Sequence, residues 1–107
     1  MDNSYLNDRF VSKDFSELFE FMLSLNLGSY VAGSFQEQDH DPCILLYNPD
    51  EGVVVIAKLL LSWDCEFFDP AEILENGAIV LSVYSHTVEP DSDIHCVMRE
   101  SMELVLR

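Results

Sequence analysis

Residues 43–63, CILLYNPDEGVVVIAKLLLSW, predict a β-hairpin at the centre of the fold. Two apolar runs, 43–47 and 53–63, flank a polar turn in which Pro49 fits the second turn position and Gly52 the left-handed exit into the next strand. The second run is apolar almost throughout, which is typical of a central strand covered on both faces. Lys58 interrupts it, and we expect this cation to pair with a carboxylate or to reach solvent at an edge rather than to act in catalysis.

A helix and a strand are predicted before the hairpin. Asp14 and Glu17 have the spacing of a capping box, and Gly28 supplies a stop. Between them apolar residues recur at helical spacing: Phe15, Leu18, Phe19, Met22 and Leu25. Residues 30–35 favour a β-strand, and the polar run 36–42 that follows predicts a loop. Residues 1–13 show no clear period and are expected to form a loosely packed N-terminal segment.

Three further elements are predicted after the hairpin. Asp69 fits an N-cap and Pro70 the first position of a short helix over residues 71–75, which Asn76 and Gly77 terminate. Residues 78–86 alternate like a strand, and the sequence 89–91 ends it. Residues 94–106 fit a helix face and a strand face equally well; Asp93 as a cap and the strong helix formers in the segment favour the helix.

The resulting order is α-β-β-β-α-β-α over a single domain of residues 1–107. Consecutive strands joined by short connections pair antiparallel. The sequence therefore predicts an α+β fold with a mostly antiparallel four-stranded sheet and helices packed on it.

The location expected for this chain is the cytoplasm. Its first residues, MDNSYLND, lack the basic and apolar regions of a secretory signal, and the run 53–61 is too short to cross a membrane as a helix. The three cysteines, Cys43, Cys65 and Cys96, are widely spaced among apolar or aromatic neighbours. We therefore expect reduced thiols in the core rather than a disulfide framework.

Charge sets the chain apart from an ordinary small domain. The 107 residues include 20 Asp and Glu but only 5 Lys and Arg, which gives a formal net charge of −15. A hydrophobic fraction of 49% argues against a disordered acidic tail. Direct binding to nucleic acid is excluded because phosphates would be repelled, so solubility or a cationic partner is the remaining reason for the charge.

One end of the predicted sheet is expected to carry a partner-binding surface. Alternate connections of an antiparallel meander lie at the same end, so residues 36–42 and 64–76 should be neighbours. That end would gather eight carboxylates with Trp63 and Phe67 as aromatic anchors. The carboxylates are Glu37, Asp39, Asp41, Asp64, Glu66, Asp69, Glu72 and Glu75. The competing interpretation is that the loops are simply solvated and that the aromatic residues belong to the core.

The opposite end has fewer predicted acids. It collects Asp50, Glu51, Glu89, Asp91 and Asp93, with Tyr47 as the nearest aromatic residue.

The motifs of catalysis and metal binding are missing from the sequence. The adjacent pair His95 and Cys96 is the closest approach to zinc spacing, and its side chains diverge on a helix or a strand. The segment 39–41 lacks the spacing of a calcium loop, and the four glycines form no phosphate cradle or nucleophile elbow. We therefore expect no enzyme activity, no metal and no cofactor.

The leading functional hypothesis is a small intracellular inhibitor that covers the cationic surface of a basic protein such as a nuclease toxin, the role of a toxin-immunity protein or antitoxin. A first alternative is a phage-encoded mimic of nucleic acid that blocks a restriction or CRISPR complex, which would space its carboxylates along one extended face. A second alternative is an acidic chaperone of a secreted effector, which would display the apolar face of helix 15–27 to its client. Charge that serves only solubility is the remaining interpretation.

Overall fold

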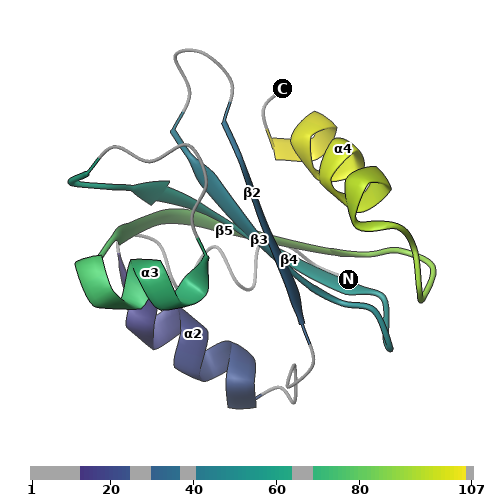
Figure 1. Ribbon diagram of the computed structural model, residues 1–107, viewed down its shortest axis with the longest axis horizontal. Helices are drawn as coiled ribbons and strands as arrows, with labels where there is room; N and C mark the ends of the chain where they lie inside the picture. Colours follow the sequence, from purple (N-terminus) through teal and green to yellow (C-terminus); the bar gives the residue numbers. More distant parts are fainter. Residues whose placement is uncertain (1–12, 25–29, 37–40, 64–68, 106–107) are drawn as a thin grey trace.

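The computed structural model describes residues 13–24, 30–36, 41–63 and 69–105, and these residues form an α+β fold. The predicted fold class and the order α-β-β-β-α-β-α are confirmed, with one short strand added at the front. Figure 1 shows a central antiparallel sheet with helices on both faces.

The sheet is a meander of four long strands. They are β2 (Val31–Phe35), β3 (Cys43–Asn48), β4 (Val53–Leu60) and β5 (Ile79–Thr87), each antiparallel to the next. A two-residue strand, β1 (Lys13–Asp14), pairs with the start of β5, so the described sheet has the order β1-β5-β4-β3-β2. The sequence did not predict β1, because two residues are too few to show a period.

The turn between β3 and β4 forms as predicted. Gly52 adopts a φ of 73°, and its N–H donates to the carbonyl of Asn48 at 2.8 Å. The carbonyl of Gly52 then accepts from Val88 N at 2.8 Å, which ties this turn to the end of β5. A Cβ atom at Gly52 would lie 2.1 Å from the Val88 carbonyl oxygen, so this contact requires glycine.

Two helices cover one face of the sheet. The helix α2 (Phe15–Ser24) buries Phe15 and Leu18, and α3 (Pro70–Asn76) buries Ile73, against strand residues such as Leu46 and Val55. Asp14 caps α2 as predicted: its Oδ1 accepts from Ser16 N and Ser16 Oγ, each at 2.8 Å. The part of the predicted first helix beyond Ser24 lies outside the described residues.

The third helix covers the other face. This is the C-terminal segment whose apolar pattern fitted a helix and a strand equally well. It forms a helix, α4 (Ile94–Val105), as its cap and its helix-forming residues favoured. Asp93 caps it, since Asp93 Oδ2 accepts from His95 N at 3.1 Å. Val97, Ser101 and Val105 recur at a spacing of four and are buried, and Val97 and Val105 pack with Leu45, Tyr47 and other strand residues.

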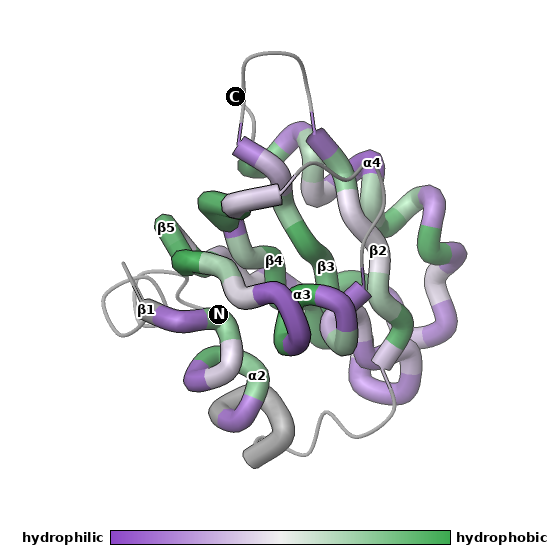
Figure 2. The backbone as a smooth tube through the Cα atoms, turned by 60° about the vertical axis from the view of Figure 1, so that its left-hand side comes forward, coloured by the Kyte–Doolittle hydropathy of each residue, from purple (hydrophilic) through white to green (hydrophobic). Residues whose placement is uncertain are grey.

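The central strands are apolar on both faces, as the hairpin sequence predicted. Val55, Ala57 and Leu59 of β4 belong to the cluster under α2 and α3, whereas Val54 and Ile56 belong to the cluster under α4. Figure 2 shows the same contrast, with hydrophobic strands in the middle and hydrophilic turns around them. The prediction was wrong at the end of this strand, because β4 ends at Leu60 and not at Trp63, and Leu60 is 50% exposed.

Gly33 of the strand β2 lies against the side chain of Met98 on α4. A Cβ atom at Gly33 would lie 2.9 Å from the sulfur of Met98 on α4. The Met98 side chain therefore occupies the space that a side chain at residue 33 would need.

Candidate functional site

The strand order brings the two predicted connections to one end of the sheet. The connection from β2 to β3 and the connection from β4 to β5 both leave at this end, and Leu59 N donates to the carbonyl of Pro42 at 2.9 Å across it. The helix α3 then folds beneath the sheet toward α2 (Figure 1). Half of the ten predicted contact residues belong to the described part of the chain; Glu37, Asp39, Asp64, Glu66 and Phe67 lie outside it.

Asp69 has a structural role that was predicted from its position. Its Oδ1 accepts a hydrogen bond from Glu72 N at 2.9 Å, which caps α3 directly before Pro70. The helix ends where Gly77 N donates to the carbonyl of Ile73 at 2.7 Å. Because the Asp69 carboxylate is exposed and also caps the helix, it holds negative charge at a fixed place on the surface.

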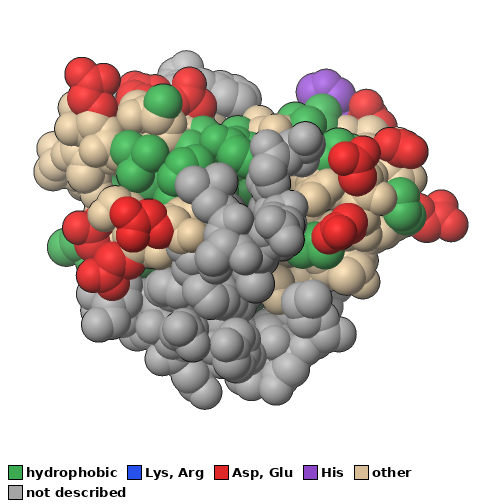
Figure 3. All heavy atoms as spheres, turned by 90° about the horizontal axis from the view of Figure 1, so that it is seen from below, with side chains coloured by type: hydrophobic (Ala, Val, Ile, Leu, Met, Phe, Trp, Pro, Cys, Tyr) green, Lys and Arg blue, Asp and Glu red, His purple; other side chains and the backbone are tan. Residues whose placement is uncertain are grey.

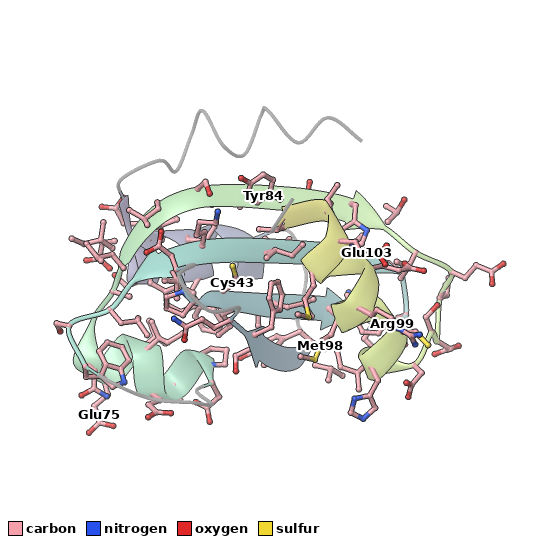
Figure 4. All side chains as sticks on the ribbon, turned by 90° about the horizontal axis from the view of Figure 1, so that it is seen from above. Cys43, Glu75, Tyr84, Met98, Arg99 and Glu103 are labelled. Atoms are coloured by element: carbon pink, nitrogen blue, oxygen red, sulfur yellow. The ribbon has the colours of Figure 1, made fainter. Side chains whose placement is uncertain are left out.

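The acidic side of α3 faces away from the core. Ile73 is fully buried, whereas Glu75 is exposed and points outward at the edge of the molecule in Figure 4. Glu72 is half-buried, and its backbone carbonyl accepts from Asn76 Nδ2 at 3.0 Å. This amphipathic arrangement presents carboxylates to solvent because the opposite side of the helix is anchored in the core.

Trp63 is buried more deeply than we expect for an aromatic side chain that is fully available to a binding partner. The side chain is half-buried and packs against the core cluster beneath α2 and α3. Its indole Nε1 is buried and has no hydrogen-bond partner. The indole therefore contributes to the edge of the core, and only part of it is available to a partner.

Asp41 lies exposed beside the start of β3, close to a thiol and a cation. Cys43 pairs across the strands with Lys58, and Cys43 Sγ contacts the backbone carbonyl of Asp41 at 3.7 Å. Burial raises the pKa of the Cys43 thiol to about 11, while Lys58 lowers it and Asp41 raises it. Lys58 is half-buried on the central strand β4, and its pairing with a carboxylate stays a prediction.

The cysteines differ from one another. Cys43 is a buried free thiol, as predicted. The prediction was wrong for Cys96, which is exposed on α4, where Arg99 Nη2 donates to its sulfur at 3.5 Å. The helical spacing of the segment turns Cys96 away from the buried row of Val97, Ser101 and Val105. Cys65 lies outside the described residues.

The opposite end of the sheet forms a second acidic surface. Asp50, Glu51, Glu89, Asp91 and Asp93 are all exposed there. Two backbone hydrogen bonds hold their turns together, from Val88 N to Gly52 O at 2.8 Å and from Asp91 N to Pro49 O at 2.9 Å. Figure 3 shows acidic side chains on both sides of the molecule and no Lys or Arg side chain of the described residues on the face it presents. Acidity is therefore not confined to the predicted end.

The sequence did not predict an apolar groove that lies at the end of the sheet where the partner-binding surface was expected. The groove has a volume of about 840 Å³, and its described lining comes from β1, from the end of β4 and from the junction between α3 and β5. Its described lining residues are Asp14, Leu60, Leu61, Ser62 and Asn76 to Ile79. The only available signal was the run of leucines at 59–61, which was interpreted as buried strand.

Among the described residues, no cluster of three or more His, Cys, Asp or Glu side chains is placed to hold a metal ion. None of the described helices is long and apolar enough to cross a membrane. Comparisons with protein-family models, with curated protein sequences and with solved structures find no match to this chain.

Proposed function

We propose that the protein is a small acidic inhibitor that binds a basic, nucleic-acid-acting protein and covers its cationic surface, in the manner of a toxin-immunity protein or antitoxin. The observation that carries the proposal is the net charge of −15, displayed by exposed carboxylates on a well-packed fold. Nucleases need cationic clefts to hold their phosphate substrates, so an acidic partner is complementary to those clefts.

The mechanism proposed is occlusion. Long-range attraction accelerates the encounter, and buried contacts then slow dissociation. Asp41, Glu72 and Glu75 supply negative charge at the predicted end, Asp69 supplies a carboxylate fixed by its capping bond, and Trp63 supplies an aromatic edge. Occlusion needs no catalytic residue, metal or cofactor in the inhibitor, and the proposed site of action is the cytoplasm.

A nucleic-acid mimic is the second candidate, and one observation favours it. Exposed carboxylates occur at both ends of the sheet and also on α4, at Glu100 and Glu103. Such a distribution resembles charge spread along a face more than charge confined to one patch. For the chaperone alternative, Phe15 and Leu18 of α2 are buried against the sheet, so these two residues of the apolar face are not displayed to a client.

The test is affinity capture from a lysate at low salt, elution along a salt gradient, and a nuclease assay on each eluted protein with and without added inhibitor. A toxin-immunity role predicts one basic nuclease that elutes at high salt, because a buried interface persists when charges are screened. This nuclease should lose its activity when the inhibitor is added back. A large nucleoprotein complex in its place supports the mimic. If a broad set of basic proteins elutes at moderate salt and none is inhibited, the proposal is wrong.

Matched variants locate the interface. Asp41→Asn with Glu75→Gln removes two charges from the predicted end, and Glu51→Gln with Glu89→Gln removes two from the opposite end. Asp69 and Asp93 are left intact because they cap helices. We expect the first pair to slow association and to flatten its salt dependence more than the second pair does. Equal effects of the two pairs would contradict an interface at the predicted end.

A further inference from the structure

The apolar groove beside β5 has a defined arrangement of side chains. Leu60 of β4 pairs with Ile79 of β5, and Ile79 pairs with Asp14 of β1, so these residues form one row across three strands. Leu60 is 50% exposed and Ile79 is 48% exposed. Single exposed apolar residues are ordinary, but two adjacent ones lining a groove mark a surface that can bury apolar side chains of a ligand.

The groove exists because the strands extend beyond the helix on that face. In the alternation of β4, Leu60 lies on the same face as Val54, Ile56 and Lys58. Val54 and Ile56 belong to the buried cluster beneath α4, whereas Leu60 does not. A register shift in the β4–β5 pairing between Lys58 and Leu59 brings Ile79 opposite Leu60. Leu61 and Ala78 pack against the core on the α2 and α3 side and form a fixed base for the groove.

The charges at the groove select its ligand. Asp14 is the charged residue of its described lining, and hydrogen bonds from Ser16 hold the pKa of Asp14 below its ordinary value, so this carboxylate stays ionised near neutral pH. Lys58 lies two residues from Leu60 and is half-buried beside Cys43. Lys13 precedes Asp14 in β1 and is a second cation of this region. Against the excess of 15 negative charges on the chain, these two cations do not make the surface attractive to an anion.

The same charge argues against a second copy of the chain as the occupant. Two copies that each carry a net charge of −15 repel each other, and the described lining of the groove offers no cation to pair with Asp14 of a neighbour. A basic segment that carries an apolar side chain meets both requirements, since its cations lie near acidic surface while its apolar group fills the groove.

We propose that this groove is the apolar half of the partner-binding surface and takes up a large apolar side chain from a basic segment of the partner. The inference rests on the proposed function and adds to it a specific docking position, with Leu60 and Ile79 as the contacts. Burial of that side chain would give the interface slow dissociation, which surface charge alone does not provide.

The first test uses a defined probe, a fluorescein-labelled decapeptide of alternating Lys and Leu. Its fluorescence anisotropy is measured against the protein at about 0.3 M NaCl, where exposed charges more than about 8 Å apart are largely screened. We expect Leu60→Thr to weaken binding about tenfold or more, as truncation of a central apolar contact does. Leu104→Thr is the matched control, because Leu104 is 44% exposed on α4, away from the groove, and we expect less than about a twofold change.

Two further comparisons complete the test. A decapeptide of alternating Lys and Ser should bind much more weakly at the same salt concentration, and amide chemical shifts should move mainly at residues 60–62 and 76–79 when the Lys and Leu peptide is added. Equal binding of the two peptides, or equal effects of Leu60→Thr and Leu104→Thr, would overturn the inference. If Leu60→Thr does not fold, the chemical-shift map of the unmodified protein decides between these outcomes.

Failure of this inference is distinguishable from failure of the proposed function. A captured nuclease that Leu60→Thr inhibits as well as the unmodified protein does would leave the function standing and remove the groove from it. If the peptide binds specifically at the groove but no captured partner is inhibited, the groove remains an apolar binding site and the proposed inhibitory function is wrong.

Discussion

At the scale of single residues, Gly52 and Gly77 separate two reasons for needing glycine. Both have positive φ, 73° and 83°, but a Cβ atom at Gly52 would meet the Val88 carbonyl oxygen at 2.1 Å, whereas one at Gly77 meets nothing within 4 Å. We expect Gly77→Ala to cost about 1 to 2 kcal/mol, the strain of a positive φ. Gly52→Ala should cost clearly more, because the turn must also move away from β5.

Urea unfolding of the two variants checks this expectation. The result is the difference between their free energies of unfolding, and the unmodified protein sets the reference. Equal losses for the two substitutions would mean that the turn at Gly52 relaxes without cost, in which case the hydrogen bond from Val88 N to Gly52 O is not a rigid link between the turn and β5.

His86 links β5 to α4, and we expect its imidazole to make stability depend on pH. Ser101 Oγ donates to the carbonyl of Val97 at 2.7 Å and lies 3.1 Å from His86 Nε2, so the imidazole Nε2–H is the donor between them. Burial lowers the pKa of His86, which Glu100 and a backbone hydrogen bond with Thr87 partly oppose. The unfolded chain therefore binds a proton at His86 more readily than the folded protein does.

The sign of the pH effect follows from that difference. The contribution of His86 is complete above the unfolded pKa of about 6.5 and is lost as pH falls below it. We expect His86→Gln to flatten the dependence of unfolding free energy on pH between about 7.5 and 5.5, a window above the ordinary carboxylate range. His95→Gln, at an exposed position, is the control. An unchanged slope in His86→Gln would show that this imidazole titrates alike in both states.

At the scale of elements, α3 depends on its cap. Asp69→Ala removes the acceptor for Glu72 N, and the expected cost is about 1 kcal/mol of unfolding free energy. Asp69→Asn keeps an acceptor oxygen and removes the charge, so its stability should stay near that of the unmodified protein. In binding experiments, Asp69→Asn therefore isolates the contribution of charge. A loss of stability in the Asn variant equal to that in the Ala variant would mean that charge, rather than the hydrogen bond, holds α3.

Local sequence signals predicted the elements well where cap, period and stop agree. Asp69 with Pro70 and Gly77 fixed a helix of seven residues, and the turn at 48–52 fixed the central hairpin. The segment 94–105 carried two periods at once, and only its cap and its helix-forming residues favoured the correct one.

The wrong predictions have a common physical cause. Each concerns whether a side chain is covered by another part of the fold, which the local sequence does not show. Leu60 continues an apolar strand, and no local pattern shows that coverage by the α4 cluster stops before it. Cys96 has apolar neighbours in sequence, but the helix turns it outward. The groove was missed for the same reason, because Asp14, Leu60 and Ile79 meet only through strand pairing between distant segments. Among the predicted contact residues, the sequence marked the capping role of Asp69 in advance, and its competing interpretation placed Trp63 against the core, where the side chain packs.

At the scale of the whole molecule, charge and core oppose each other. The core consists of two buried clusters, one beneath α2 and α3 and one beneath α4 on the other face of the sheet. Around it, exposed carboxylates gather at both ends of the sheet, so folding brings like charges closer than they are in the unfolded chain. A cationic partner would relieve this repulsion on binding, which links the stability of the protein to the function proposed for it.

Salt should therefore stabilise the isolated protein. Two like charges 10 Å apart in water repel by about 0.4 kcal/mol, and many such pairs act within a chain of net charge −15. Raising NaCl from about 0.01 M to 0.3 M shortens the screening length from about 30 Å to below 8 Å. We expect the free energy of unfolding, measured with uncharged urea at neutral pH, to rise by on the order of 1 to 2 kcal/mol. The double variant Asp41→Asn with Glu75→Gln should rise less, because it carries two fewer negative charges. A decrease with salt would mean that ion pairs of the few cations outweigh the repulsion, and the relief of repulsion could then not contribute to partner binding.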